Sequence, residues 1–186
     1  MRTFVRQLRP AALMLLAMIL LIAIYTGVMT GVAQIVFPYQ ANGSVITVRL
    51  ADGTEKTYGS ELLEQKFTDA KYLIGRPMDV TSLSPVSDEM KALIVQRMDW
   101  WRNFDPDATA NGIPSDLING SGSGVDPYIS PEAAEFQVNR VAQARGISPD
   151  AVRAVIQKYT RGRFLGFIGE PGVNVLMVNL ALDGEI

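Results

Sequence analysis

The chain has 186 residues, of which 48% are hydrophobic, and it contains neither cysteine nor histidine. Disulfides and thiol chemistry are therefore excluded, and the residue that most often serves as a general base or a metal ligand is missing. Beyond Arg9 the chain carries 14 Lys and Arg against all 19 Asp and Glu, a formal charge of −5. A nucleic-acid-binding domain, or one held electrostatically on an anionic membrane, needs the opposite sign.

An apolar segment near the N-terminus predicts a membrane span. Residues 11–24 read AALMLLAMILLIAI, and no charge lies between Arg9 and Arg49. A helix over residues 11–32 would be roughly 33 Å long, enough to cross a hydrocarbon core of ~30 Å. A cleaved signal peptide is the alternative, but the run is long for a signal core and no clear small-x-small cleavage site follows it.

The charges around this span predict its orientation. Three arginines precede it, so the positive-inside rule places residues 1–10 in the cytoplasm, a transmembrane signal anchor at 11–36 and an extracytoplasmic domain at 37–186. The expected location is the bacterial inner membrane. Within the span, Gly27 and Gly31 form a GxxxG pattern that allows close packing on another membrane helix. A chance occurrence is the alternative, because glycine is common in membrane helices.

The outer domain begins with strand-like and then helical patterns. Residues 45–59 alternate around Asp52-Gly53 and predict a β-hairpin. Ser60 is expected to cap a short helix through Gln65. Ser87 then caps a helix that extends to residue 104, with acidic residues in its first turn.

The C-terminal half reads as a long loop followed by three helices. Residues 105–129 are rich in Asp, Gly, Ser, Pro and Asn, which is typical of a functional or disordered loop. Ser-Pro-acid sequences begin helices at Ser130 and Ser148, and Gly146 ends the first. VNVLMVNLAL, residues 173–182, is apolar on nearly every side and predicts a central buried helix, with a core strand as the alternative. The fold class is α+β, mostly helical, with a small β-hairpin or sheet and one N-terminal transmembrane helix.

The residues that usually carry chemistry do not assemble into a recognisable catalytic set. Ser121 and Ser123 lie in an SGSG sequence that lacks the glycine spacing of a nucleophile elbow and the Gly-Lys-Ser/Thr of a phosphate-binding loop. Either a tight turn or a protein contact explains it. Carboxylates available for acid/base work are Asp105, Asp107, Asp116, Asp126, Glu132, Glu135 and Glu170. We expect no catalytic and no metal-binding residues.

Polar and aromatic residues near this loop are candidates for a protein contact. Gln137 and Arg140 lie on the helix that follows the SGSG loop, where they form either a solvated face or an interface anchor. Trp100 and Trp101 are adjacent, so they cannot both point into one core. One of them is expected either to face a partner or to pack under a loop.

Four stretches taken together resemble the C subunit of bacterial Kdp-type potassium-transporting ATPases. They occur in the family's order and cover most of the chain: YTGVMTGVAQIVFPYQANGS, GSELLEQKFTDAKYLIGRP, SGSGVDPYISPEAAEFQVNRVAQARGIS and LGFIGEPGVNVLMVNLAL. The chain departs from the family where Tyr128 replaces a usual His, and where the segment 78–85 is shortened. This identifies a divergent member.

The resemblance implies a non-catalytic, single-pass subunit of a high-affinity potassium uptake pump. Its implied partners are a channel-like potassium-binding subunit (KdpA), a P-type ATPase subunit (KdpB), a small subunit (KdpF) and the lipid bilayer. The complex would use ATP, Mg²⁺ and K⁺, with no cofactor assigned to this chain. The implied role is support of assembly and of coupling, with contact candidates Gly27, Gly31, Ser121, Ser123, Asp126, Gln137, Arg140 and Glu170. The rival readings are an anchored binding module and a carboxylate-dependent hydrolase.

Overall fold

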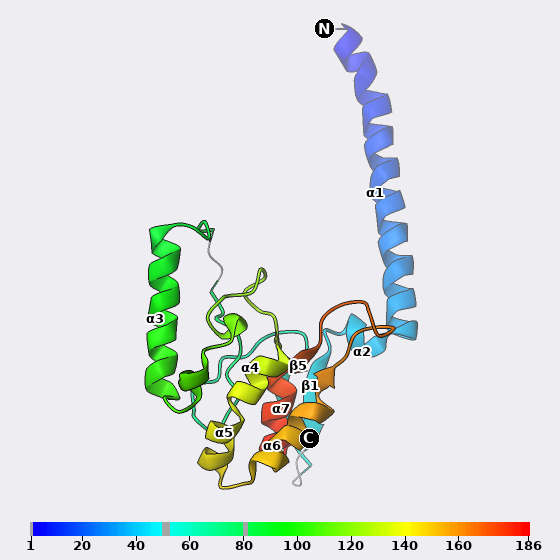
Figure 1. Ribbon diagram of the computed structural model, residues 1–186. Helices are drawn as coiled ribbons and strands as arrows, with labels where there is room; N and C mark the ends of the chain where they lie inside the picture. The colour runs from blue at the N-terminus through cyan, green and yellow to red at the C-terminus, as the bar shows by residue number, and fades with distance from the viewer. Residues whose placement is uncertain (1, 50–52, 80–81) are drawn as a thin grey trace. The chain divides into compact units, whose positions relative to one another are not determined.

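The computed structural model describes residues 2–49, 53–79 and 82–186. The chain divides into two compact units, Met1–Val45 and Ile46–Ile186, and the second, which is expected on the outer side of the membrane, is called the outer unit below (Figure 1). About half of the chain is helical, and the strands form small antiparallel sheets, as the sequence predicts.

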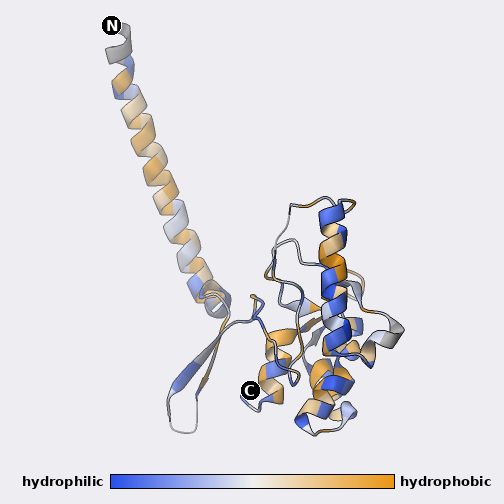
Figure 2. Cartoon of the chain, turned by 90° about the vertical axis from the view of Figure 1, so that its left-hand side faces the viewer, coloured by the Kyte–Doolittle hydropathy of each residue, from blue (hydrophilic) through white to orange (hydrophobic). Residues whose placement is uncertain are grey.

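The first unit is dominated by one long apolar helix. Helix α1 spans Arg2–Val36, and the short helix α2, Pro38–Ala41, follows it. The stretch Gln7–Val36 is 30 residues long, sufficient by length and composition to cross a membrane. Figure 2 shows the hydrophobic colouring along most of α1. The predicted helix over 11–32 is therefore confirmed, and α1 extends beyond it at both ends.

The predicted hairpin is present at the start of the outer unit. Strand β1 is Val45–Arg49 and strand β2 is Glu55–Ser60. The hydroxyl oxygens of Thr47 and Thr57 lie 3.3 Å apart across the pair. Asp52, in the predicted turn, lies outside the described residues.

One expected helix does not form. Residues 61–66 have no helical assignment, so the prediction of a helix between Ser60 and Gln65 is wrong. The Ser60 hydroxyl accepts a hydrogen bond from the Leu62 amide at 3.1 Å, which makes a turn rather than a helix cap. The Glu64 amide donates instead to the carbonyl of Val125, 2.9 Å away, and so ties this segment to the SGSG loop.

Helix α3, Asp88–Phe104, begins as predicted. The Ser87 hydroxyl accepts a hydrogen bond from the Met90 amide, and acidic residues occupy the first turn. At its other end Trp101 is buried, and its indole N–H donates to the Leu117 carbonyl at 3.1 Å. Trp100 is 43% exposed and stacks on Phe104 with ring centroids 4.5 Å apart. The adjacent tryptophans thus separate into one core residue and one surface residue.

The predicted helix over 131–145 forms as two pieces. Helix α4 is Pro131–Phe136, helix α5 is Val138–Arg145, and Gln137 lies at the break between them. Helix α6, Pro149–Lys158, follows after Gly146, whose φ of 66° is the left-handed conformation expected at a helix end. The apolar residues of these helices recur at helical spacing and face the core: Ala134, Val138, Val141, Ala142, Val152 and Ile156 are buried, and Val155 and Tyr159 are partly buried.

A three-stranded antiparallel sheet and helix α7 complete the core. Strands β3 (Tyr128–Ile129) and β4 (Thr160–Arg161) flank strand β5 (Gly172–Asn174) in the order β3-β5-β4. Helix α7, Val175–Leu182, continues directly from β5 and packs against α6 (Figure 1). VNVLMVNLAL therefore forms a short strand and the buried helix predicted for it. A second cluster joins the hairpin to α7 through Ile46, Leu176 and Leu180.

Much of the long loop over residues 105–129 packs against the core. It contains the 3₁₀ helices η1 (Ala108–Asn111) and η2 (Ser115–Leu117). Leu117 is 2% exposed, and the neighbouring Ile113 and Ile118 pack against the main core. Packing of these three residues against the core explains why a segment so rich in Gly, Pro and Asp has a defined conformation.

Candidate interaction site

The SGSG loop is folded on itself by short-range hydrogen bonds. The Ser121 hydroxyl accepts from the Asp126 amide at 3.4 Å, and the Ser123 hydroxyl accepts from the Val125 amide at 3.3 Å. The carboxylate of Asp126 in turn accepts from the amide of Tyr128 at 3.1 Å, which leads the chain into β3. Ser123 and Val125 remain exposed. The loop is therefore a preformed surface feature rather than an open linker.

Two of the expected contact residues line one pocket. Asp126 and Glu170 both face a pocket of about 590 Å³, together with Tyr128 and Arg161. Tyr128 is the position at which the family resemblance leads us to expect a His. Glu170 is exposed and its carboxylate lies 2.9 Å from the guanidinium of Arg163. The tertiary structure thus brings together residues that are 44 positions apart in the sequence.

Gln137 is buried within the chain and binds its backbone. Its side-chain oxygen accepts from the Ile74 amide at 2.8 Å, and its side-chain nitrogen donates to the Ile74 carbonyl at 3.0 Å. The same nitrogen donates to Ala133, and the oxygen also accepts from Arg140 at 2.6 Å. Gln137 has no exposed surface. It is neither a solvated residue nor an exposed anchor in this chain.

Asn179 makes the same kind of contact with Leu73, the residue before Ile74. It lies on α7, is 1% exposed, and bonds both the amide and the carbonyl of Leu73 at 2.8 and 2.9 Å. Two buried amide side chains therefore take the place of a neighbouring strand for Leu73 and Ile74. The segment needs them because buried backbone groups must have partners, and residues 70–76 belong to no helix or strand.

Two arginines hold the adjoining carbonyls. Arg140 is 8% exposed and donates to the carbonyls of Ala70 and Tyr72 at 2.5 and 3.0 Å. Arg145 donates to the Lys71 carbonyl at 2.7 Å and contacts the carboxylate of Asp183 at 2.8 Å. We call residues 70–74, held by Gln137, Asn179, Arg140 and Arg145, the clamped segment.

Arg140 also forms a buried ion pair. Its guanidinium Nε lies 3.3 Å from the Asp105 carboxylate, and both side chains are less than a tenth exposed. Burial lowers the pKa of Arg140 to about 10 and raises the pKa of Asp105. Both pKa values move toward the neutral forms, so loss of hydration outweighs mutual attraction in this pair.

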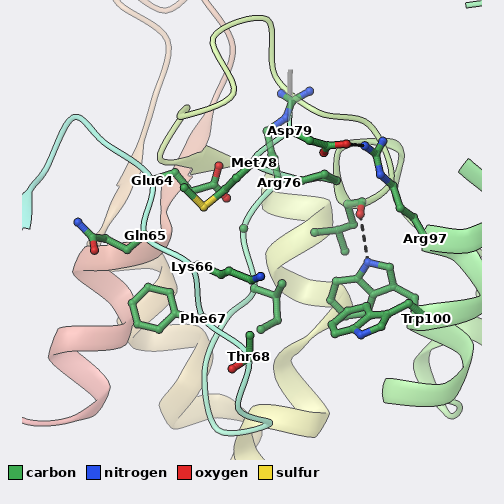
Figure 3. Close-up of a pocket in the computed structure, with 15 residues that line it drawn as sticks. Glu64, Gln65, Lys66, Phe67, Thr68, Arg76, Met78, Asp79, Arg97 and Trp100 are labelled. Carbon is green, nitrogen blue, oxygen red and sulfur yellow. Dashed lines mark hydrogen bonds and ion pairs between the residues drawn. The ribbon is translucent and has the colours of Figure 1, made fainter. Parts of the chain in front are cut away.

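A second buried carboxylate lies beside an apolar pocket. The pocket, of about 560 Å³, has Glu64, Arg76, Met78 and Trp100 among its lining residues (Figure 3). Glu64 is 6% exposed, and one of its oxygens has no hydrogen-bond partner. Burial, with a smaller effect from nearby Asp126, raises the pKa of Glu64 to about 7.

The membrane helix carries the other expected contact. Gly27 and Gly31 lie one turn apart on α1, and a Cβ added at either glycine would meet nothing within 4 Å. Ala23 lies one turn earlier on the same face. The face is therefore open to another helix in this chain taken alone.

The carboxylates considered for catalysis are largely engaged in structural contacts. Asp116 accepts from the Ser130 amide at 2.6 Å and lies 3.2 Å from its hydroxyl, and Glu135 pairs with Arg153 at 2.7 Å. Asp105 pairs with Arg140 as described above. Among the described residues, no group of three or more Asp and Glu is placed to hold a metal ion.

Comparison with known proteins identifies the family. The model of the KdpC family, described as the K⁺-transporting ATPase c chain, matches residues 8–184. The chain belongs to the KdpC family. It is an accessory subunit of the K⁺-transporting ATPase rather than its catalytic subunit, and with one N-terminal apolar helix it is a membrane protein.

Curated relatives match this KdpC chain over most of its length. A potassium-transporting ATPase KdpC subunit of Listeria monocytogenes serovar 1/2a is 46% identical over 98% of both chains. One from Clostridium perfringens is 46% identical over 87% of this chain and 88% of its own. One from Clostridium botulinum is 42% identical over 87% of each. The four stretches on which the resemblance was based are thus supported by similarity along the whole chain.

The clamped segment is the feature that sequence reasoning missed. One signal was present, because Asn174 and Asn179 interrupt an otherwise apolar run that is predicted to be buried. A buried amide must find partners, so each of these two residues predicts an irregular segment nearby. Their partners are Glu61 and Leu73, more than 100 positions away, and nothing in the sequence identifies them.

Proposed function

We propose that this KdpC subunit stabilises the assembled pump through two contacts, one in the membrane and one outside it. In the membrane, the face of α1 that carries Gly27 and Gly31 packs on a helix of another subunit. Outside, the pocket lined by Asp126 and Glu170 and the adjoining Ser121 and Ser123 dock on the channel-like potassium-binding subunit. ATP, Mg²⁺ and K⁺ are then used by the partner subunits.

The observation that carries this proposal is the preformed state of the SGSG loop. Its own side chains satisfy the amides of Val125 and Asp126, and Val125 accepts from the segment at Glu64. A surface that is already ordered loses little conformational entropy on binding, which favours a stable contact between subunits. Gln137 and Arg140 contribute from below by fixing the clamped segment rather than by direct contact.

We further propose that residues 1–10 are cytoplasmic and that the outer unit lies outside the cell. The three arginines before the span support this orientation. Because the chain has no natural cysteine, the single variant Ser123→Cys offers one labelling site on an exposed residue. A membrane-impermeant maleimide added to intact protoplasts should label it. Labelling only after lysis would contradict the orientation.

Co-purification tests the contacts. A C-terminally tagged chain, expressed together with the channel-like and ATPase subunits and extracted in mild detergent, should recover both in equal amounts. Gly27→Leu should reduce that recovery, because a Leu side chain fills the space that a neighbouring helix would occupy. Ala33→Leu is the matched control, since residue 33 lies on a different face of the helix.

The outer contact is tested by charge reversal. Glu170→Lys should reduce recovery of the channel-like subunit, whereas Glu135→Lys, an exposed carboxylate on α4, should leave recovery unchanged. Because each glutamate pairs with an arginine in the wild-type chain, both variants lose an ion pair of similar kind. Equal recovery with all four variants would contradict both proposed contacts.

A further inference from the structure

The loop between β4 and β5 exposes an unusual set of side chains. It reads RGRFLGFIGEPG over residues 161–172 and projects from the outer unit as the orange-brown loop that leads into β5 (Figure 1). Four large apolar side chains in five consecutive positions are exposed by about half or more: Phe164 64%, Leu165 70%, Phe167 74% and Ile168 49%. Single exposed apolar residues are ordinary, but a contiguous apolar tip marks a contact surface.

The tip has a defined conformation. The amide of Phe164 donates to the carbonyl of Ile168 at 2.8 Å, and the amide of Ile168 donates back at 2.9 Å. Between them Leu165 has a φ of 52° and Gly166 a φ of 83°. A leucine in the left-handed region is strained, so the hydrogen-bonded turn holds its side chain outward at some cost. The apolar residues are therefore presented by the backbone rather than left in a flexible coil.

The charges around the tip are arranged as at a membrane interface. Lys158, Arg161 and Arg163 precede it, and Glu170, the one acidic residue between positions 158 and 172, pairs with Arg163. Long cationic side chains next to an apolar tip can extend to the headgroups while the tip enters the acyl region. The rest of the outer unit is acidic overall, so burial of apolar side chains, rather than attraction to anionic lipid, would hold the contact.

The length of the tether makes this contact possible. Membrane helix α1 ends at Val36 and the outer unit begins at Ile46, so at most ~32 Å of chain separates them. A unit of roughly 140 residues is about 37 Å across, because its radius of gyration is ~14 Å. A tether this short allows the outer unit to touch the bilayer surface.

We propose that the tip formed by residues 164–168 inserts into the interface of the lipid bilayer beside α1. The contact gives the outer unit a second attachment to the membrane, in addition to the covalent one, and limits its rotation. It uses zwitterionic lipid as readily as anionic lipid, and it requires no other subunit. It goes beyond the docking surface proposed above: Phe164 and Ile168 also line that pocket, whereas Leu165 and Phe167 do not.

Site-specific labelling of the full chain tests this proposal. The chain has no cysteine, so Phe167→Cys carries one environment-sensitive NBD fluorophore. In phosphatidylcholine nanodiscs, a nitroxide on the lipid acyl chain should quench this label strongly. Ile147→Cys is the matched control, because it replaces another exposed apolar residue, at the turn between α5 and α6, and should be quenched little. Adding Phe164→Asp to the Phe167→Cys chain should remove the quenching while leaving thermal unfolding unchanged.

Two outcomes overturn the proposal. Equal quenching at positions 167 and 147 would show that the tip has no preferred contact with lipid. A label at 167 that is shielded only after the channel-like and ATPase subunits are added, and is not quenched by nitroxide lipid, would assign the tip to a protein partner instead. The second result would extend the docking surface to the tip, because Phe164 and Ile168 also line its pocket, whereas the first leaves the co-purification tests unaffected.

Discussion

Replacing Gln137 by leucine should destabilise the outer unit far more than the small change in side-chain volume suggests. Leucine has a similar volume but no polar atoms, so the amide and the carbonyl of Ile74 both lose their partner, and Arg140 loses one acceptor. Gln137 has no exposed surface, so water cannot replace it without a rearrangement. Each unsatisfied buried group costs about 1–3 kcal/mol, which predicts a total loss of ~2–5 kcal/mol.

The measurement is urea unfolding of the full chain in detergent micelles, followed by the fluorescence of Trp100 and Trp101. For a unit of this size, the predicted loss also corresponds to a Tm lower by roughly 6–15 °C. Gln143→Leu is the matched control, because it makes the same Gln-to-Leu change at an exposed position on α5. It should change stability by less than ~0.5 kcal/mol.

Amide hydrogen exchange separates this mechanism from a general packing defect. In the wild-type chain the amides of Leu73 and Ile74 belong to no helix or strand, but they should be protected because they donate hydrogen bonds to the side chains of Asn179 and Gln137. Gln137→Leu should remove protection at Ile74 first. If both leucine variants were equally stable, or if protection at Ile74 survived Gln137→Leu, the side-chain clamp would not be what holds this segment.

Three further predictions concern buried charges and one close backbone approach. The folded pKa of Glu64 is about 7 and its unfolded pKa is near 4.5, so the wild type should lose up to ~3 kcal/mol of stability as pH rises from 4.5 to 7. The stability of Glu64→Gln, measured by urea unfolding across this pH range, should lack that decline. Equal pH dependence of stability in the two proteins would contradict the prediction. Arg140→Met should cost ~3–5 kcal/mol in urea unfolding because it leaves Asp105 buried and unpaired, whereas Asp105→Asn should cost less because Arg140 keeps three other hydrogen-bond acceptors. Gly120→Ala should lower the Tm because its Cβ would lie 2.7 Å from the Asp79 carbonyl, whereas Gly122→Ala, which meets nothing within 4 Å, should not; equal Tm values would mean that the loop shifts freely.

Local chemistry made the helices of this protein predictable. Ser87, Ser130 and Ser148 each cap a helix by accepting a hydrogen bond from an amide three residues later, and Gly146 ends one in the left-handed conformation. These interactions span a single turn, so the sequence contains all of their participants. At Ser60 the same reasoning failed, because a serine hydroxyl serves a turn as readily as a helix cap.

The candidate site could be predicted only in part. Asp126 and Glu170 were expected at a contact surface, and the fold brings both to one pocket. Gln137 and Arg140 were expected at the same surface, but both are buried beneath the clamped segment. Helical periodicity indicates which face a residue occupies, but not whether that face meets solvent or an irregular stretch of the same chain.

By itself, the sequence determined the membrane helix, the hairpin, the capped helices and the KdpC family, because each depends on residues near one another or on a pattern along the whole chain. Only the tertiary structure decided the clamped segment, the buried pair of Asp105 and Arg140, and the outward apolar tip at 164–168. Each of these joins or exposes residues according to how distant segments pack. Packing is set by the shape of the whole core, so a polar residue such as Gln137 acquires its role only when Ile74, 63 positions earlier, is placed against it.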